Sequence, residues 1–311
     1  MTGRAISMLA AVGVLASLIG FGGAAEAQPN QTAVAAAAPV LTGVEKRQST
    51  INEISSRSPK SAVAKCPAGK KVVGGGGWTM EETSTAPDRL TLTQLEPKDD
   101  VDGLGTDGYI ASAAETSPGV SGNWWVQAYV FCADAISVSG WHINADFTDT
   151  TSDPRQQMAV GCDNPATQRV IGTGARIAVS AGFEGQVVLQ VARASGPGDI
   201  TRAQSHEDAD GYTGTHWLGA YAICMNTPQG YSVATGESTE RLSETHKIAF
   251  AGCGGKQLLS AGAAITDVAP GNVSLQVVFP GSNVEAFAVE NTPTSLNWDF
   301  IIARGICVDK P

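Results

Sequence analysis

The residues best suited to chemistry are a glutamate and a tryptophan that recur near the end of three homologous segments. Each glutamate stands 17 residues before a cysteine, and a tryptophan precedes that cysteine by seven residues in the first two segments and by nine in the third. Because side chains alternate along a strand with period two, all three tryptophans are expected to face away from their cysteine. The candidate binding residues are Glu115, Trp125, Glu207, Trp217, Glu290 and Trp298.

A tryptophan beside a glutamate suits the recognition of saccharides. The indole presents a broad flat face for stacking on the C–H surface of a sugar, and a nearby carboxylate accepts hydrogen bonds from hydroxyl groups. The competing interpretation is structural: a tryptophan at a repeat position fills a gap between sheets, and a glutamate at a strand end accepts backbone N–H bonds from a turn. Only Trp124 and Trp141, which recur less well, fall outside that interpretation. Exposure of the indole rings distinguishes the two.

The motifs of hydrolytic enzymes are missing from the sequence, which has neither a G-x-S-x-G elbow nor an H-E-x-x-H motif. The four histidines, at positions 142, 206, 216 and 246, do not recur at equivalent places and predict no shared metal site. Two alternatives stay open: an acid/base group formed by His206, Glu207 and His216, and a carboxylate pair for glycoside cleavage. We predict a protein that is not an enzyme, with no catalytic residue, no metal and no cofactor.

An acidic loop around residues 99–107 offers one further candidate site. Its segment GLGTDG (103–108) matches G-x-G-x-x-G, but it precedes a strand instead of linking a strand to a helix, which argues against dinucleotide binding. Several carboxylates on a flexible loop could hold Ca²⁺, although Ala111 stands where an EF-hand needs glutamate. We favour a solvated acidic turn formed by Asp99, Asp100, Asp102 and Asp107.

Three diverged copies of one unit must position the candidate residues. Their opening cysteines are spaced 96 and 91 residues apart. The segments within each copy alternate over four to eight residues, favour Val, Ile, Leu, Thr and aromatic residues, and are separated by Gly, Pro, Asp and Asn, which predicts strands. The glycine run at 74–77 predicts a bulge or a close approach of backbone or ring. We expect an all-β fold of three homologous antiparallel β-sheet or sandwich repeats, packed with pseudo-threefold, β-prism-like symmetry or arranged in tandem.

Six cysteines permit fifteen pairings, which the repeats reduce to two regular schemes. If each copy closes itself, the pairs are Cys66–Cys132, Cys162–Cys224 and Cys253–Cys307. The rival scheme links Cys132 to Cys162, Cys224 to Cys253 and Cys66 to Cys307. We favour closure within each copy, because it joins equivalent positions of equivalent units.

The N-terminal region has the features of a secretory signal peptide. Arg4 precedes an apolar stretch, and Ala25-Glu26-Ala27 forms a small-x-small cleavage site. A membrane anchor is the alternative, although the apolar run is only marginally long enough to span a bilayer. The expected divisions are a signal peptide (1–27), a flexible leader (28–57), repeat 1 (58–132), repeat 2 (133–224) and repeat 3 (225–311).

The charge of the chain limits its partners. Its 20 basic and 30 acidic residues give a net charge of −10. Nucleic acid and anionic lipid are both polyanions that a basic surface would have to neutralise, so neither is expected as the main partner.

The block SPKSAVAKCPAGKKVVGGG (58–76), with Glu115 and the later AYVFCA (128–133), resembles a repeat found singly or in tandem in exported proteins of high-GC Gram-positive bacteria, of unassigned function. Copy two keeps AYAIC (220–224), and copy three is the most degraded. The resemblance implies export and one disulfide per repeat, but no activity. Three Greek-key-like copies also resemble the β-prism of egg vitelline membrane outer layer proteins, in architecture only.

We therefore expect a secreted, extracellular, non-enzymatic binding or structural repeat protein whose ligand is a polysaccharide or another polymer of the cell envelope. Three equivalent Glu/Trp sets favour multivalent binding, because duplicated weak sites gain avidity. The alternative is a secreted, glycosidase-like hydrolase that uses acidic residues in a cleft between repeats.

Overall fold

The computed structural model describes residues 37–311 apart from residues 52, 83–88, 240–244, 267–270 and 293–297. The predicted signal peptide, and with it the alternative of a membrane anchor, lies outside these residues. Within the described part of the chain, no helix is long and apolar enough to cross a membrane.

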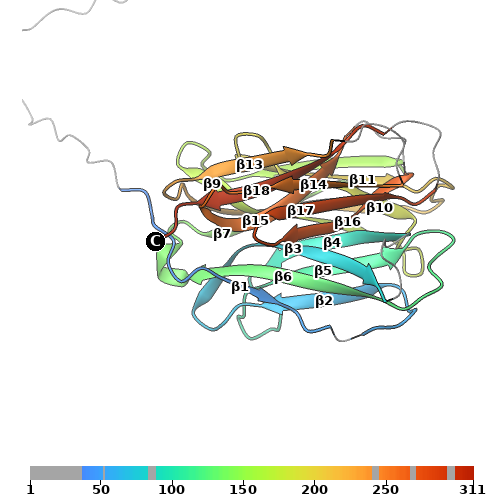
Figure 1. Ribbon diagram of the computed structural model, residues 1–311, viewed down its shortest axis with the longest axis horizontal. Helices are drawn as coiled ribbons and strands as arrows, with labels where there is room; N and C mark the ends of the chain where they lie inside the picture. The colour runs from blue at the N-terminus through green and yellow to red at the C-terminus, as the bar shows by residue number, and fades with distance from the viewer. Residues whose placement is uncertain (1–36, 52, 83–88, 240–244, 267–270, 293–297) are drawn as a thin grey trace, which may run out of the picture. The chain divides into compact units, whose positions relative to one another are not determined.

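The described residues form eighteen strands and one short 3₁₀ helix, η1 (Ala135–Ser137), which confirms the all-β prediction (Figure 1). The strands fall into three sets of six. The first set is β1 (Glu45–Gln48), β2 (Lys60–Lys65), β3 (Lys70–Glu81), β4 (Leu90–Lys98), β5 (Gly108–Glu115) and β6 (Trp124–Asp134). The second is β7 (His142–Phe147), β8 (Arg155–Gly161), β9 (Gln168–Ala178), β10 (Val187–Ala194), β11 (Ile200–Glu207) and β12 (Trp217–Asn226). The third is β13 (Ser232–Glu237), β14 (His246–Ala251), β15 (Gln257–Ile265), β16 (Val273–Pro280), β17 (Val284–Glu290) and β18 (Ile301–Val308).

Strands from different repeats combine in every sheet, so the repeats are not separate tandem sandwiches. Sheet I has the order β1-β6-β3-β16-β17-β14, sheet II β2-β5-β4-β9-β12-β7, and sheet III β13-β18-β15-β10-β11-β8. Each sheet therefore takes the first, sixth and third strands of one repeat and the fourth, fifth and second strands of another. The connectivity is cyclic through all three repeats, while the pseudo-threefold axis itself stays a prediction.

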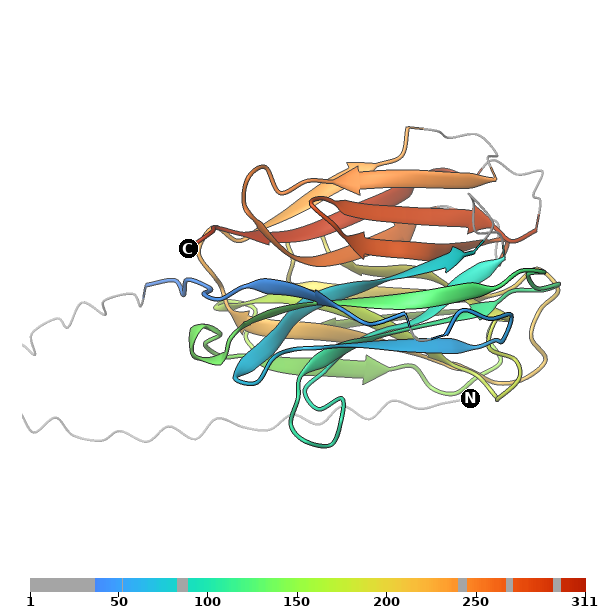
Figure 2. The ribbon, with the colours of Figure 1, turned by 60° about the horizontal axis from the view of Figure 1, so that its bottom comes forward.

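The two halves of each sheet meet over a short junction. Only two residue pairs join β3 to β16, β9 to β4 and β15 to β10. Glycine makes this approach possible: a β-carbon on Gly76 would collide with the carbonyl oxygen of Val278, and one on Gly174 with that of Leu95. The predicted bulge is also present, between Val72 and Gly74. The small-residue strands thus mark the places where repeats join, as where β3 of the first repeat lies beside β16 of the third (Figures 1 and 2).

The core lies between the inner faces of the three sheets. One cluster of buried residues includes Leu92 and Ile171 of sheet II, Leu259 of sheet III and Val278 of sheet I. The alternation expected of a half-buried strand is clearest in β2, where buried and exposed residues follow one another in turn. The face of each sheet that points away from the core is its outward face, which carries the candidate sites.

The segment expected to be a flexible leader contributes to the fold. Glu45–Gln48 form β1, which pairs with β6, and Leu41 is 2% exposed within the core. β1 takes the same place in sheet I as β7 in sheet II and β13 in sheet III. The first repeat therefore begins before residue 58, because its own edge strand lies in the predicted leader.

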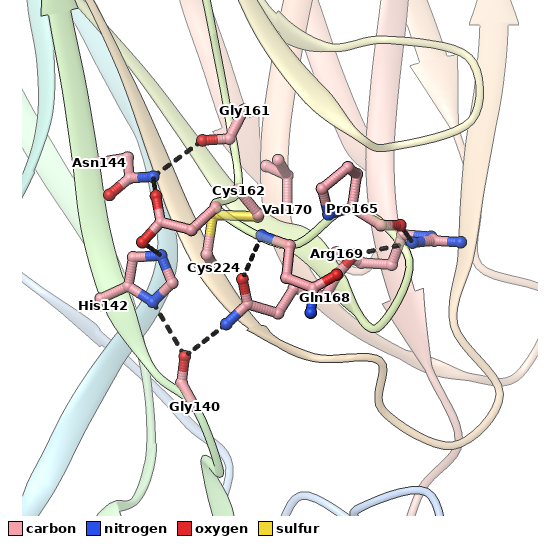
Figure 3. The surroundings of a disulfide bond; sticks show 12 residues. Gly140, His142, Asn144, Gly161, Cys162, Pro165, Gln168, Arg169, Val170 and Cys224 are labelled. Carbon is pink, nitrogen blue, oxygen red and sulfur yellow. Dashed lines mark hydrogen bonds and ion pairs between the residues drawn. A yellow bond between two sulfur atoms is a disulfide. The ribbon is translucent and has the colours of Figure 1, made fainter. Parts of the chain in front are cut away.

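Each of the three disulfides joins two cysteines of the same repeat, as predicted: Cys66–Cys132, Cys162–Cys224 and Cys253–Cys307. Each bond links the end of the second strand of a repeat to the last strand, and so connects two different sheets. Around Cys162–Cys224 the amide of Asn144 donates to the carbonyl oxygen of Gly161 at 2.9 Å, which fastens β7 to the end of β8 (Figure 3). Three such bonds are typical of a protein that folds in an oxidising compartment.

Candidate functional site

In the first and third repeats, a fully buried tryptophan belongs to a structural cluster. Glu115 does not pair with Trp125; its Oε1 accepts a hydrogen bond from Nε1 of Trp124 at 2.8 Å, and Trp124 is fully buried. The ammonium of Lys60 lies 4.0 Å from the Trp124 ring centroid and donates to the Trp124 carbonyl oxygen at 2.5 Å. A cation held over an indole, with the indole N–H bound to a carboxylate, is a satisfied polar group within the core.

Trp298 belongs to the same kind of cluster, which corrects its assignment as an exposed binding residue. It is fully buried, and the ammonium of Lys247 lies 4.2 Å from its ring centroid and donates to its carbonyl oxygen. Trp298 is thus the counterpart of Trp124 and not of Trp125 or Trp217. The alternation argument fails for Trp298 because this residue precedes β18, which begins at Ile301.

The second repeat replaces this cluster with other residues. Gln156 stands in the place of the lysine and donates to the carbonyl oxygen of His216 at 2.8 Å. His216 occupies the place of the tryptophan and is fully buried, and no described residue forms a hydrogen bond with either ring nitrogen. Oε1 of Glu207 likewise has no hydrogen-bond partner among these residues, and burial lowers the pKa of His216. His206, Glu207 and His216, the candidate acid/base group, are each at most 9% exposed and therefore lie inside the fold, away from its surface.

Trp217 has a different setting, on the outward face of sheet II. It is only partly buried at the start of β12, and the ring of Phe147 on β7 stands edge-on to it at 5.2 Å between centroids. Phe147 also stands edge-on to Tyr221, at 5.9 Å. The guanidinium of Arg176 lies 5.4 Å from the Trp217 ring centroid. We call Phe147, Trp217 and Tyr221 the aromatic cluster.

A groove of about 280 Å³ lies beside the aromatic cluster at the junction of repeats 1 and 2. Arg176 lines it, and Ala178, also in its wall, pairs directly with Trp217. Its floor holds a chain of polar groups: Ser112 Oγ lies 3.0 Å from Ser61 Oγ and 2.7 Å from Oε1 of Gln94. This groove, termed the polar groove, offers hydroxyl, amide and guanidinium groups next to a partly exposed indole.

Sheet III has a groove at the corresponding junction, with a volume of about 470 Å³. The junction pair Gln94–Arg176 of sheet II is replaced by Val191–Ala264 in sheet III. Three arginines line this second groove, namely Arg155, Arg193 and Arg202. We refer to it as the arginine groove.

Sheet I carries aromatic residues at its junction. Trp78 and Phe279 are 5.4 Å apart between ring centroids, Tyr129 and Phe279 are 4.8 Å apart, and the ammonium of Lys46 lies 5.2 Å from the Phe279 centroid. Trp125 lies on this sheet and is partly buried, but it has no aromatic or cationic ring contact within the described residues. Trp217 is consequently the stronger of the two exposed candidates.

The carboxylates of the acidic loop bind protein groups, within the loop and on the neighbouring strands. Asp100 Oδ1 accepts the backbone N–H of Gly105 at 3.1 Å, and Asp102 Oδ1 accepts that of Leu104 at 3.1 Å. Asp107 is buried, and its Oδ2 accepts the backbone N–H of Val72 at 3.0 Å. The bonds of Asp100 and Asp102 are those of a turn stabilised by aspartate side chains, whereas Asp107 ties the loop to β3.

Trp217 was predicted from the sequence as a binding residue and stays a prediction, whereas neither groove was predicted. Their walls come from strands of two repeats, and the exchange of strands that unites them leaves no trace in residue spacing. Comparison with known proteins adds no assignment, because the chain matches no protein-family model and no curated protein matches it significantly.

Proposed function

We propose that the protein is an exported, non-enzymatic binding protein that takes a saccharide segment of a cell-envelope polymer along the outward face of sheet II. The supporting observation is the partly exposed Trp217 next to a groove of hydroxyl and amide groups. An indole face supplies stacking on sugar C–H groups, while Ser112, Gln94 and Arg176 supply directional hydrogen bonds.

The charge of the groove fits an uncharged or weakly charged polymer. Arg176 lies 3.5 Å from Oε2 of Glu96, so the basic and acidic groups of this face offset each other. Gln94 also donates to Oε2 of Glu96, at 2.5 Å. The polar groups are thus held in place before a ligand arrives, which lowers the entropic cost of binding.

The proposal is tested by retention of the protein on insoluble polysaccharides such as cellulose, chitin and isolated cell walls. Trp217→Ala should weaken retention about tenfold, equivalent to the loss of about 1.4 kcal/mol of binding free energy. Trp125→Ala is the matched control, because it removes an indole from the equivalent position of sheet I, where the junction is aromatic and lacks the polar groove. Melting temperatures measured on the same samples separate lost binding from lost folding.

Equal retention of the wild type and Trp217→Ala on every polymer would contradict the assignment of Trp217. Release of soluble sugars by the wild type, abolished by Glu184→Gln in the groove wall, would replace binding with hydrolysis.

A further inference from the structure

Three arginines form one row across the outward face of sheet III. Arg193 of β10 and Arg202 of β11 are direct cross-strand partners. Arg304 of β18 pairs with Gly262 of β15, and a β-carbon on Gly262 would lie 2.8 Å from the Cα of Arg193. Direct partners project from the same side of a sheet, so these three guanidinium groups share one face.

No ion pair neutralises this row within the described residues. Burial lowers the pKa of Arg304 and the charge of Glu237 opposes this shift, but Glu237 forms no ion pair with that arginine there. Nε of Arg193 and Nε of Arg304 are buried and have no hydrogen-bond partner in the described part of the chain. Burial, followed by the charges of Arg304 and Arg202, lowers the pKa of Arg193. Like charges directly opposite each other destabilise a sheet, so the row has a cost in the free protein.

The fold does not require arginine at these positions. The pair equivalent to Arg193–Arg202 is Glu96–Ile110 in sheet II and Phe279–Glu285 in sheet I. The glycine equivalent to Gly262 faces Tyr221 in sheet II and Tyr129 in sheet I, where sheet III has Arg304. Three cations in one row are therefore a property of sheet III alone, in a chain whose net charge is −10.

We propose that the arginine groove is a binding site for an oxyanion group, a carboxylate or a phosphate, carried by a small ligand. Guanidinium groups bind such oxygens through paired N–H donors, and an anion placed between Arg193 and Arg202 would cancel their mutual repulsion. The groove of about 470 Å³ also holds the amides of Gln157 and Gln204 and the apolar side chain of Val191, which suits an organic body attached to the anion. The acidic remainder of the protein repels polyanions, so the ligand carries few charges.

The test titrates the full protein with inorganic phosphate and separately with glucuronate, at constant ionic strength, and follows melting temperature and heat of binding. Sodium chloride is the reference anion. We expect both oxyanions to raise the melting temperature of the wild type, with the stronger effect identifying a free phosphate or a sugar acid as the source of the oxyanion. Arg202→Gln should weaken the affinity for the better ligand at least tenfold.

Two further variants make the result decisive. Arg57→Gln removes the same charge from an exposed position outside the groove and should bind as the wild type does. Arg202→Glu should form an internal ion pair with Arg193, so it should abolish binding while melting at or above the temperature of the wild type, which a misfolded variant would not do. Two outcomes would overturn the proposal: no oxyanion-dependent shift in the wild type, or equal affinity in Arg202→Gln and Arg57→Gln.

Discussion

The polar groove and the arginine groove occupy the same position in the cyclic arrangement of strands, yet they offer opposite chemistry. Both lie where the third strand of one repeat meets the fourth strand of another. The polar groove combines hydroxyl and amide groups with an adjacent indole, whereas the arginine groove presents cations without acidic partners. The glycines and disulfides that form the framework recur, whereas the polar residues that line the two grooves do not. Fold and binding chemistry are thus specified by different positions of the repeat.

Removing a buried residue of the framework should have the largest effect on stability. Trp124→Ala removes a fully buried indole, and the first repeat contributes strands to sheets I and II. We expect the free energy of unfolding to fall by about 3–5 kcal/mol, as for other buried aromatic residues. Urea denaturation measures this loss, with Trp125→Ala as the partly exposed control. A loss below 1 kcal/mol would show that the Lys60–Trp124–Glu115 cluster does not support the framework.

The residue that follows the recurrent glutamate is a buried acid only in the second repeat. Burial, with a contribution from Asp210, raises the pKa of Asp208 to about 7, whereas the equivalent residues are Thr116 and Asn291. The folded state keeps a proton that the unfolded chain loses above its lower pKa, so this group's contribution to stability is present at pH 4 and is lost as the pH rises towards 7.

Asp208→Asn should therefore stabilise the protein by about 2 kcal/mol at pH 8 and have little effect at pH 4. Urea denaturation of both proteins at the two pH values checks the prediction. The lowered pKa of His216 destabilises both proteins alike in acid, so it cancels in the comparison. A stabilisation that does not depend on pH would contradict the assigned titration.

The glycines at the junctions allow the packing of two sheet junctions to be compared through the stability of alanine variants. A β-carbon on Gly174, at the polar groove, collides with the carbonyl oxygen of Leu95, whereas one on Gly262, at the arginine groove, would lie 2.8 Å from Arg193 Cα. Gly174→Ala should destabilise the protein by about 1–3 kcal/mol, and Gly262→Ala by less. Thermal unfolding of the two variants gives the order, and the reverse order would show that the junctions are not equivalently packed.

The smallest expected effect concerns the arginine row alone. With no oxyanion present, Arg202→Gln should stabilise the protein by up to about 1 kcal/mol, because it removes a like charge directly opposite Arg193. The gain should shrink in high salt, which screens exposed charges. Chemical denaturation at two salt concentrations measures it, and destabilisation at low salt would mean that Arg202 has a favourable partner.

Local features of the fold were predictable from the sequence, whereas the assembly of the repeats was not. Alternating segments and recurring cysteines predicted the strands and all three disulfides. The exchange of strands between repeats rests on two residue pairs at each junction, too few to leave a pattern. Trp298 was misplaced because spacing from a cysteine predicts the facing of a side chain only while the strand continues. The arginine row was missed because Arg304 belongs to a different repeat from Arg193 and Arg202.

The cyclic exchange of strands also governs when the protein can fold. β3, at residues 70–81, completes sheet I only by pairing with β16, at residues 273–280. A chain that emerges from its N-terminus therefore cannot finish its first sheet until almost the whole polypeptide is available. Until then, the repeats that are synthesised first expose unpaired strand edges, and such edges promote aggregation. Completion of sheet I is thus delayed until the third repeat has been synthesised, and in a truncated chain lacking that repeat the edge of β3 that faces away from β6 has no partner strand.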